Sequence, residues 1–275
     1  MLPKLGPVGF VRSLLRILAG RPQVPPSLQD NALLQTVLRR RTVRRFTHDP
    51  VPDDVFAAIL EAGRVAPCTV NLQTWTFAAL SAADWRDVFG NPIPFGGQRA
   101  VIVMADTHRV KTVLDPFPAS PLVEYTLAVV NASLAAMNMN VAAEAMGVSS
   151  VMLSETGRSG FLDVGYLCET LKLPPGVIPL MTIVFGYPAG SYPPMPPKLP
   201  LEQILMRAQY REPDLQVMQD WLSQMMAGYK ASHLDSSFEG QLRIYESKIG
   251  QAESDLQRLI RIERGPEDKR VNGNL

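Results

Sequence analysis

The stretch RRRTVRRF at residues 39–46 and the stretch VAPCTVNLQTW at residues 65–75 carry the strongest structural signal in this chain of 275 residues. If residues 40–44 are extended, alternate side chains share one face and Val43 turns away from it. The converging side chains are then those of Arg40, Thr42 and Arg44. Two guanidinium groups and a hydroxyl suit a phosphate dianion, because charge-assisted hydrogen bonds are the strong ones. The cluster alone fits a solvated helix end equally well.

Three later segments add to this signal in a defined order. A small-residue stretch, a proline-glycine turn before a strand-like run, and a basic motif follow one another along the chain. They are NASLAAMNMNVAAEAMG at 131–147, LPPG at 173–176 with IVFGYP at 183–188, and KLPLEQI at 198–204. Together with the two opening stretches, the set resembles the FMN-dependent nitroreductase family over roughly residues 30–205. Each motif alone is weak, and their order and spacing make the set specific.

The resemblance implies an α+β, nitroreductase-like fold with a central mixed, mainly antiparallel sheet flanked by helices. It also implies an obligate-type homodimer whose active sites lie at the subunit interface. The residues agree with α+β, because short β-rich runs at 76–80, 100–105 and 180–185 mix with helices without strict alternation. No G-x-G-x-x-G follows these runs, which argues against a doubly wound dinucleotide-binding sheet.

A long helix is predicted from Ser120-Pro121 to Gly147, since proline suits a first helical turn and glycine suits a helix C-terminus. Its many alanines predict close helix packing. In the resembling family this helix is central to the dimer interface, and an ordinary core helix would show much the same alanine pattern.

The expected domain organisation is an N-terminal amphipathic arm at 1–29, an FMN-binding nitroreductase-like domain at 30–205, and a C-terminal helical extension at 206–275. The extension carries a coiled-coil-like apolar seam, weakened by Gly250. The seam consists of Phe238, Leu242, Tyr245, Ile249, Ala252, Leu256 and Leu259. Such a helix packs across the partner subunit, covers the active-site mouth or recruits another protein, and family precedent favours the first. The polar tail at 264–275 is expected to be disordered.

The N-terminal arm contains FVRSLLRILA at residues 10–19, an apolar stretch with arginines at helical spacing. It is too short and too charged to span a bilayer. Arg12 and Arg16 interrupt the apolar run that a signal peptide needs, and Gly20-Arg21-Pro22 follows where a cleavage site is expected. Two alternatives stay open: an arm that packs on a partner subunit, and a helix that makes weak membrane-surface contact.

The family pattern assigns the FMN phosphate and ribityl tail to the arginine-rich run and to the basic motif. The matching residues are Arg40, Arg41, Thr42, Arg44 and Lys198. Many relatives have a second basic residue beside the Lys198 position, whereas here Pro196, Pro197 and Leu199 surround it. Phosphate affinity is therefore expected to depend more heavily on the arginines.

Two further segments match the family's flavin ring site. One is a loop that reaches the flavin from the other subunit, and the second is a strand end whose backbone N–H groups face flavin N5 and O4. The matching residues are Pro67, Cys68, Thr69 and Asn71 in the loop, and Leu153, Ser154 and Glu155 at the strand end. Glu155 is either a general acid or a carboxylate that faces water. Gln73 is expected to hold the structure of the loop.

Two loop positions depart from the family pattern: Cys68 stands where relatives usually carry serine, and Thr74 replaces the usual proline before Trp75. Cys68 is either a catalytic thiol or a small-residue replacement, and the second is favoured because no histidine lies nearby in sequence. Phe117 is expected to line the acceptor pocket together with Cys68. It belongs to the proline-braced segment DPFPASPL at 115–122, which is either a lid with Phe117 at its tip or a rigid connector.

The resemblance implies an FMN-dependent oxidoreductase that uses NAD(P)H to reduce nitro compounds, quinones or other electron-poor acceptors by a ping-pong mechanism at flavin N5. No dedicated acid or base is then required, in agreement with the lack of a triad or paired-carboxylate pattern. One alternative is a dedicated flavin dehydrogenase or oxidase that acts on a biosynthetic intermediate. Another is a non-catalytic flavin-binding protein for assembly or sensing.

The composition and charge of the chain argue against a nucleic-acid-binding protein and against a disulfide-linked one. The chain has 27 Lys and Arg against 26 Asp and Glu, spread along its length, so no nucleic-acid-binding surface is expected. Cys68 and Cys168 are far apart and form no C-x-x-C, which favours a reduced, cytoplasmic chain. His48, His108 and His233 are scattered, and no metal site is predicted.

Overall fold

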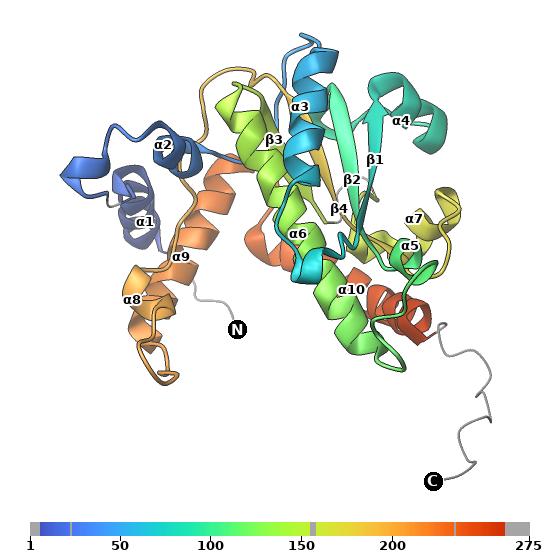
Figure 1. Ribbon diagram of the computed structural model, residues 1–275. Helices are drawn as coiled ribbons and strands as arrows, with labels where there is room; N and C mark the ends of the chain where they lie inside the picture. The colour runs from blue at the N-terminus through green and yellow to red at the C-terminus, as the bar shows by residue number, and fades with distance from the viewer. Residues whose placement is uncertain (1–5, 23, 155–157, 234, 262–275) are drawn as a thin grey trace. The chain divides into compact units, whose positions relative to one another are not determined.

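The computed structural model describes residues 6–22, 24–154, 158–233 and 235–261. The chain divides into two compact units, and Figure 1 labels the helices and strands of both. The larger unit contains Asn31–Tyr192 and Lys248–Leu275, and the smaller unit contains Met1–Asp30 and Pro193–Ser247. The sheet belongs to the larger unit, whereas the elements described in the smaller unit are helices. The partition into an arm, an FMN-binding domain and an extension stays a prediction, and the polar tail at 264–275 lies outside the described residues.

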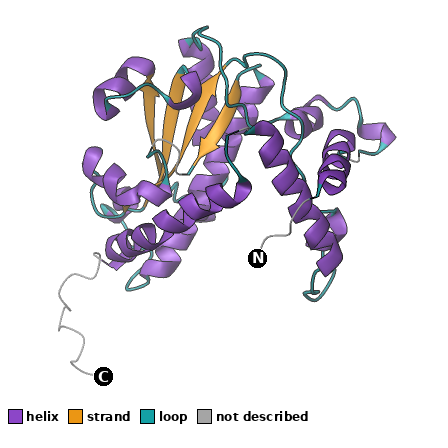
Figure 2. Ribbon diagram, turned by 180° about the vertical axis from the view of Figure 1, so that it is seen from behind, coloured by secondary structure: helices purple, strands orange, loops and turns teal. Residues whose placement is uncertain are grey.

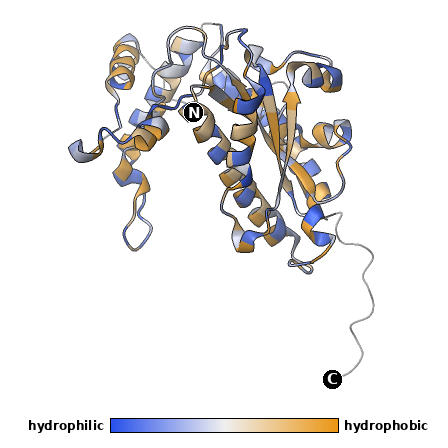
Figure 3. Ribbon diagram, turned by 45° about the horizontal axis from the view of Figure 1, so that its top comes forward, coloured by the Kyte–Doolittle hydropathy of each residue, from blue (hydrophilic) through white to orange (hydrophobic). Residues whose placement is uncertain are grey.

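The larger unit is built on a four-stranded sheet in the order β1-β2-β4-β3, and neighbouring strands pair antiparallel. The strands are β1 (Trp75–Ser81), β2 (Arg99–Asp106), β3 (Ser149–Leu153) and β4 (Val177–Gly186). The central strands β2 and β4 are buried on both faces, which explains their nearly continuous hydrophobic sequences (Figure 3). The predicted α+β fold with a mainly antiparallel sheet is confirmed; the four strands pair antiparallel, and one isolated parallel bridge joins Thr42 to Ser150 of β3.

Alternate residues of β2 point into separate cores on the two faces of the sheet, as the period of a strand requires. One core includes α3 (Asp53–Arg64) and α6 (Pro121–Ala145), and the other includes Trp85 of α4 (Ala82–Phe89). The β2 residues are Val101, Val103 and Ala105 in the first core, and Ala100, Ile102 and Met104 in the second. Figure 2 shows helices on both sides of the strands.

The helix α6 confirms the long helix predicted between Ser120-Pro121 and Gly147. Gly63 of α3 lets α6 pack closely on it, because a Cβ added to Gly63 would lie 2.7 Å from Met139 Cγ of α6. Gly147 has a φ of 77°, a left-handed conformation that suits the residue after a helix. By length and composition alone α6 would suffice to cross a membrane, yet in this fold five of its alanines belong to the core beside the sheet.

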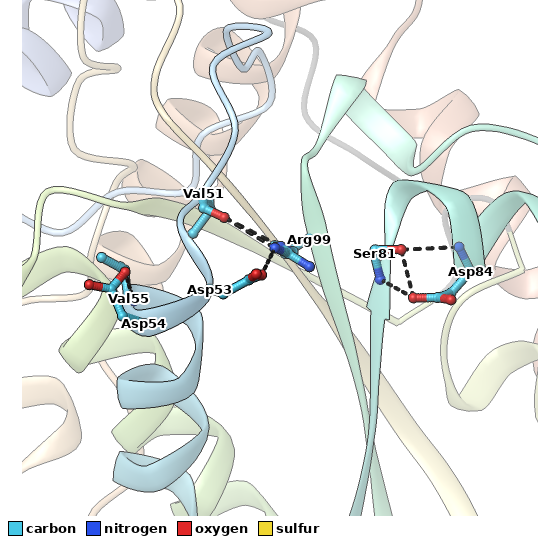
Figure 4. A network of polar contacts seen from close by, with 7 residues as sticks. All are labelled: Val51, Asp53, Asp54, Val55, Ser81, Asp84 and Arg99. Atoms are coloured by element: carbon cyan, nitrogen blue, oxygen red, sulfur yellow. Dashed lines mark hydrogen bonds and ion pairs between the residues drawn. The ribbon is translucent and has the colours of Figure 1, made fainter.

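Two polar networks fix the starts of α3 and α4 (Figure 4). Arg99 of β2 pairs with Asp53 in the first turn of α3, and its Nη2 donates to the Val51 carbonyl oxygen at 3.4 Å. At the start of α4, Ser81 and Asp84 form a capping box in which Ser81 Oγ accepts from the Asp84 N–H at 3.2 Å. Both networks bind a helix start to the end of a strand, so the helices keep their position over the sheet.

Short helices complete the larger unit. They are α2 (Ala32–Arg39), η2 (Thr69–Asn71), η3 (Pro94–Gly96), α5 (His108–Lys111), η4 (Phe161–Asp163), α7 (Val164–Thr170) and the part of α10 (Phe238–Arg261) from Lys248 onward. This part of α10 packs on η4 and α7. Lys248 Nζ lies 3.1 Å from Asp163 Oδ2, and a Cβ added to Gly165 would meet the Asp255 carboxylate.

The apolar seam predicted for the C-terminal helix divides between two environments. Ala252 is buried, and Leu256 and Leu259 are half-buried, so the second half of the seam packs within its own chain. Leu242 and Ile249 are exposed. Contact of this helix with a partner subunit therefore stays a prediction for the exposed positions.

The smaller unit contains a packed helix pair, α1 (Pro7–Ala19) and α9 (Leu215–Ser232). Ile17 of α1 is buried, and its Cδ1 would lie 3.2 Å from a Cβ added to Gly228 of α9. Arg16 Nη1 pairs with Asp220 Oδ2 at 2.9 Å. One face of the predicted N-terminal helix therefore packs on its own chain. The unit also contains η1 (Pro26–Leu28), α8 (Leu201–Ile204) and the first part of α10.

Candidate functional site

The arginine-rich run lies as an extended segment beside β3. Thr42 forms a parallel bridge with Ser150, and the Val43 N–H donates to the Ser150 carbonyl oxygen at 3.1 Å. Val43 and Phe46 are only 4% and 8% exposed, and both belong to the core that includes α4. The prediction that Val43 turns inward is confirmed. The alternate positions are the half-buried Arg40 and Thr42 and the exposed Arg44.

Arg41 closes the C-terminal end of α2. Its Nη1 donates to the carbonyl oxygens of Leu38, Arg39 and Arg40 at 2.7, 2.8 and 2.9 Å. A guanidinium in this position satisfies carbonyls that lack intrahelical partners and offsets the negative end of the helix dipole. A phosphate contact by Arg41, as the resemblance implies, would compete with these three bonds.

Tyr192 supports the run from a distant part of the chain. Its hydroxyl accepts from the Arg41 backbone N–H at 3.2 Å and donates to Glu144 Oε1 of α6 at 2.5 Å. Burial and the hydrogen bond to Glu144 raise the pKa of Tyr192, so its hydroxyl stays a donor at neutral pH. No sequence motif points to this residue, because its partners are 151 and 48 residues away.

The loop predicted to approach the flavin ring follows α3 and contains η2. Val70, Asn71 and Gln73 have left-handed φ angles of 49°, 56° and 50°. A β-branched residue such as valine rarely adopts this conformation, and backbone strain of this kind concentrates at functional sites. The Val70 side chain is also exposed, so burial of that side chain does not explain the strain.

Asn131 of α6 holds both ends of this loop; it opens the small-residue segment at 131–147, to which the family pattern assigned no such role. It is 1% exposed, and its Oδ1 accepts from the Thr69 backbone N–H at 3.1 Å and from Thr69 Oγ1 at 3.3 Å. Its Nδ2 donates to the buried Thr74 Oγ1 at 2.9 Å. Thr74 therefore supplies a side-chain acceptor that the usual proline lacks. The sequence signal that could have identified Asn131 is an amide side chain at a core position of an alanine-rich helix.

Cys68 lies in the loop with a half-buried thiol. Its Sγ accepts from the Gln73 N–H at 3.3 Å and lies 4.0 Å from Asn71 Oδ1. Neither neighbour is a base that would generate a thiolate, so these contacts favour the small-residue interpretation and agree with a structural role for Gln73. Contacts of Pro67, Cys68, Thr69 and Asn71 with a flavin stay predictions.

The end of β3 is the third part of the predicted site. Leu153 is buried and pairs with Thr182 of β4. The Ser154 carbonyl oxygen accepts from the Leu162 N–H at 3.2 Å, and a Cβ added to Gly160 would lie 2.4 Å from Ser154 Cα. Glycine at 160 therefore lets the chain fold back directly over Ser154. Glu155 lies outside the described residues, and its role stays a prediction.

Phe117 is buried at 7% exposed, which favours the rigid connector over a lid with Phe117 at its tip, and its place in the acceptor pocket stays a prediction. The Phe117 N–H donates to Asp115 Oδ1 at 3.1 Å, and its carbonyl oxygen accepts from the Ser120 N–H at 3.2 Å. Burial of a large aromatic surface outweighs the turn pattern that suggested an exposed tip. A direct contact with an acceptor would require this ring to leave its buried position.

Lys198 belongs to the smaller unit, and its side chain is exposed. Its expected approach to the FMN phosphate stays a prediction. Within the part of the chain that the structure describes, no group of three or more His, Cys, Asp and Glu side chains could hold a metal ion.

The chain is similar to bacterial flavin and nitro reductases over most of its length. It is 28% identical over 211 residues to the NADPH-flavin oxidoreductase of Vibrio harveyi, which covers 74% of this chain and 84% of that protein. It is 26% identical over 204 residues to the oxygen-insensitive NADPH nitroreductase of Salmonella typhimurium, which covers 71% of this chain and 82% of that protein.

Solved structures share the fold. NfrA2 of B. megaterium matches with a TM-score of 0.68 at 20% identity, over 84% of this chain and 96% of that chain. Nitroreductase A of Vibrio parahaemolyticus matches with a TM-score of 0.65 at 22% identity, over 79% of this chain and 91% of that chain. At these identities the likeness establishes the fold alone. The sequence model of the nitroreductase family matches residues 37–187, more than half of the chain, and the chain therefore belongs to the nitroreductase family.

Proposed function

We propose that this protein is an FMN-dependent oxidoreductase that uses NAD(P)H to reduce small electron-poor acceptors, such as nitro compounds and quinones, in ping-pong turnover. The observation that carries the proposal is the extended run at 40–46, whose backbone joins β3 and whose arginines alternate with the buried Val43. The relatives add support, since one is an NADPH-flavin oxidoreductase and a Bacillus subtilis relative is an FMN reductase (NAD(P)H).

The donor set of the run fits a phosphate monoester. Arg40 and Arg44 offer planar guanidinium groups to a dianion, and Thr42 adds a hydroxyl. Because the backbone at Thr42 and Val43 is bonded to β3, these donors start from a fixed strand. When bound, FMN would supply the two-electron redox chemistry, so the protein has to bind and orient rather than provide an acid or base. Lys198 is proposed as a further phosphate ligand.

The loop around η2 and the end of β3 are proposed to hold the flavin ring. Asn71 would offer its side-chain amide, and the backbone of Leu153 and Ser154 would face the N5 edge, together with Glu155. The support is that the loop is strained yet held by a buried amide, which fixes where its polar groups lie. Cys68 is proposed to line the acceptor pocket as a small side chain rather than as a nucleophile.

A homodimer is proposed from the apolar stripe on α6. Five alanines of α6 are buried on one side, whereas its opposite side exposes apolar residues at spacings of seven, four and three. These residues are Val123, Val130, Leu134 and Met137. A contiguous exposed apolar stripe on a folded domain marks an association surface. A second copy is the proposed occupant, because the family resemblance implies a flavin site shared between subunits.

A cytoplasmic location and separate roles for the three segments are also proposed. A cytoplasmic location fits two free cysteine thiols. The catalytic part is proposed to be 30–205, with 1–29 and 206–275 as additions to it.

The phosphate assignment is tested with the double variant Arg40→Ala/Arg44→Ala and the matched control Arg45→Ala, which removes an exposed arginine from the same run. FMN affinity is measured by titrating the flavin-free protein and following flavin fluorescence. The double variant is expected to lose about 100-fold in affinity or more, because two charge-assisted hydrogen bonds are removed, and the control about threefold at most. Unchanged affinity in the double variant would overturn the assignment.

Turnover is tested separately on the wild-type protein loaded with FMN. Its visible spectrum is recorded without oxygen while NADPH, and then NADH, is added. The flavin bands are expected to bleach and to return when a quinone is added. A flavin that stays oxidised with both nucleotides would contradict the NAD(P)H oxidoreductase and support a dedicated oxidase or a non-catalytic role.

A further inference from the structure

The helix α1 has an exposed apolar face in addition to the face that packs on α9. The exposed residues follow at spacings of three, four and three, so they form one stripe along the helix. They are Val8, Val11, Leu15 and Leu18. A shallow groove runs along this stripe, and two arginines, Arg12 and Arg16, contribute to its lining.

The stripe is not needed to hold α1 in its unit. Ile17 and Ser13 are buried on the α9 side, where Ile17 packs against Gly228. Arg16 Nη1 adds an ion pair to Asp220 Oδ2 at 2.9 Å. Four exposed aliphatic side chains in a row lose favourable transfer energy unless they meet another apolar phase. The stripe therefore points to an external occupant.

All charged residues in the sequence around the stripe are basic. Residues 1–29 contain four basic residues and no Asp or Glu, although the whole chain has a net charge of only +1. The basic residues are Lys4, Arg12, Arg16 and Arg21. Asp220 of α9 faces this charge, since it pairs with Arg16 and interacts more weakly with Arg12. Arg21 Nη1 donates to the Leu18 and Gly20 carbonyl oxygens at 2.9 Å, so its charge lies at the C-terminal end of α1.

We propose that the exposed face of α1 docks on an anionic membrane surface. A bilayer interface accepts an amphipathic helix that lies flat, with aliphatic side chains among the acyl chains and arginines at the level of the lipid phosphates. With 13 residues α1 is too short to span a bilayer, so the contact is peripheral. Four aliphatic side chains and a few positive charges give a weak, reversible association that depends on anionic lipid.

Charge favours this occupant over a second copy of the same face. Self-pairing about a two-fold axis would bring Arg12 and Arg16 of both copies close together, and like charges oppose such an interface. A membrane rich in anionic lipid has the complementary charge and needs no matching shape. The proposal concerns the smaller unit alone and does not depend on the flavin chemistry.

The test is flotation of the full-length, FMN-loaded protein with vesicles of phosphatidylcholine alone and of phosphatidylcholine mixed with phosphatidylglycerol. The protein is expected to float with the mixed vesicles and to be released at about 1 M salt, where screening acts within about 3 Å. Val11→Glu/Leu15→Glu is expected to reduce the bound fraction about tenfold, and Arg12→Gln about threefold. Val113→Glu/Leu114→Glu, which changes two exposed apolar residues of the larger unit, is the matched control and is expected to float like wild type.

Light scattering after gel filtration, without lipid, measures the molecular mass and so tests whether a second copy of the chain covers this face instead. An unchanged mass and unchanged FMN content in Val11→Glu/Leu15→Glu, together with lost flotation, would support membrane docking. Failure of the wild-type protein to float with anionic vesicles, or equal flotation of the variant, would overturn it. A halved mass in the variant would also overturn it, because the face would then be covered by a second copy.

Discussion

The two segments proposed to hold FMN in this nitroreductase-family protein are fixed in different ways. The run at 40–46 is bonded to β3 through its backbone, and Val43 and Phe46 anchor it in a core. The loop at 66–74 instead has three non-glycine residues in left-handed conformations. The hydrogen bonds at its two ends converge on one side chain, the buried amide of Asn131. The run is therefore fixed by its backbone and by buried side chains, whereas the two ends of the loop share one side-chain partner.

This difference separates two physical tasks. A phosphate dianion is bound by charge, so its site needs arginines on a firm strand and tolerates small displacements. A flavin ring that exchanges electrons with a donor and an acceptor needs polar groups within a narrow range of positions. A strained loop whose two ends share one buried amide meets that need, and it is easier to disturb.

The largest effect is expected from removing the anchor of the run with Val43→Asp. A carboxylate at a position that is 4% exposed would be buried in the core beside α4. The free energy of unfolding is expected to fall by about 3–5 kcal/mol. Val43→Ile is the control and is expected to cost less than about 1.5 kcal/mol. Urea unfolding followed by circular dichroism measures both, and similar midpoints for the two variants would show that Val43 is no anchor.

The next largest effect is expected from Asn131→Leu, which removes the amide that joins the two ends of the loop. Its loss leaves the Thr69 N–H and the buried Thr74 hydroxyl without their partner, at a cost of about 2–3 kcal/mol in unfolding free energy. Asn138→Leu is the matched control on α6, because Asn138 donates one bond to the Ala62 carbonyl oxygen at 3.1 Å; it is expected to cost about 1 kcal/mol.

The two parts of the site also predict different functional losses. Asn131→Leu is expected to slow flavin reduction by NAD(P)H more than it weakens FMN binding, since the phosphate donors are untouched. Stopped-flow reduction and FMN titration of the same variant measure the two quantities. Equal losses in both would show that the loop contributes to affinity rather than to positioning.

The run could be predicted from sequence because its pattern is local. Alternation between arginines and Val43 is set by the period of an extended chain, and the structure confirms that Val43 is buried. The long helix and the central strands could be predicted for the same reason, since the terminal proline and glycine of the helix and the β-rich composition of the strands lie within each element.

The supports of the site could not be predicted, because they join residues that are far apart in sequence. Tyr192 meets Arg41 across 151 residues, and Asn131 meets Thr69 across 62. The arginine pattern also does not reveal that the Arg41 guanidinium bonds to the end of α2, and the phosphate contact of Arg41 stays a prediction. Phe117 shows that a proline-rich turn pattern does not reveal whether the ring it carries is buried.

A smaller effect is expected from Val70→Gly, which tests the strain of the loop. Val70 and Val113 are both 86% exposed, but only Val70 of the two has a left-handed φ, at 49°. Glycine relieves the clash of a β-branched residue in this conformation, so Val70→Gly is expected to raise the unfolding free energy by about 0.5–1 kcal/mol. Val113→Gly is expected to lower it by about as much, through added freedom of the unfolded chain. Changes of the same sign in both variants would contradict strain at Val70.

The smallest effect is expected from Tyr192→Phe, because the backbone of the run is held by β3 as well. Loss of the hydroxyl that joins the Arg41 N–H to Glu144 is expected to cost about 0.5–1 kcal/mol of unfolding free energy.

Burial and the bond to Glu144 raise the pKa of Tyr192 above 10.0, so the folded state holds its proton more tightly than the unfolded state. The contribution of the hydroxyl is therefore complete below about pH 10 and is lost as the pH rises through the folded-state pKa. Urea midpoints of wild type and variant should differ at about pH 8, and the difference should shrink as the pH rises above about 10; a difference that stays constant would assign the effect to packing of the ring instead.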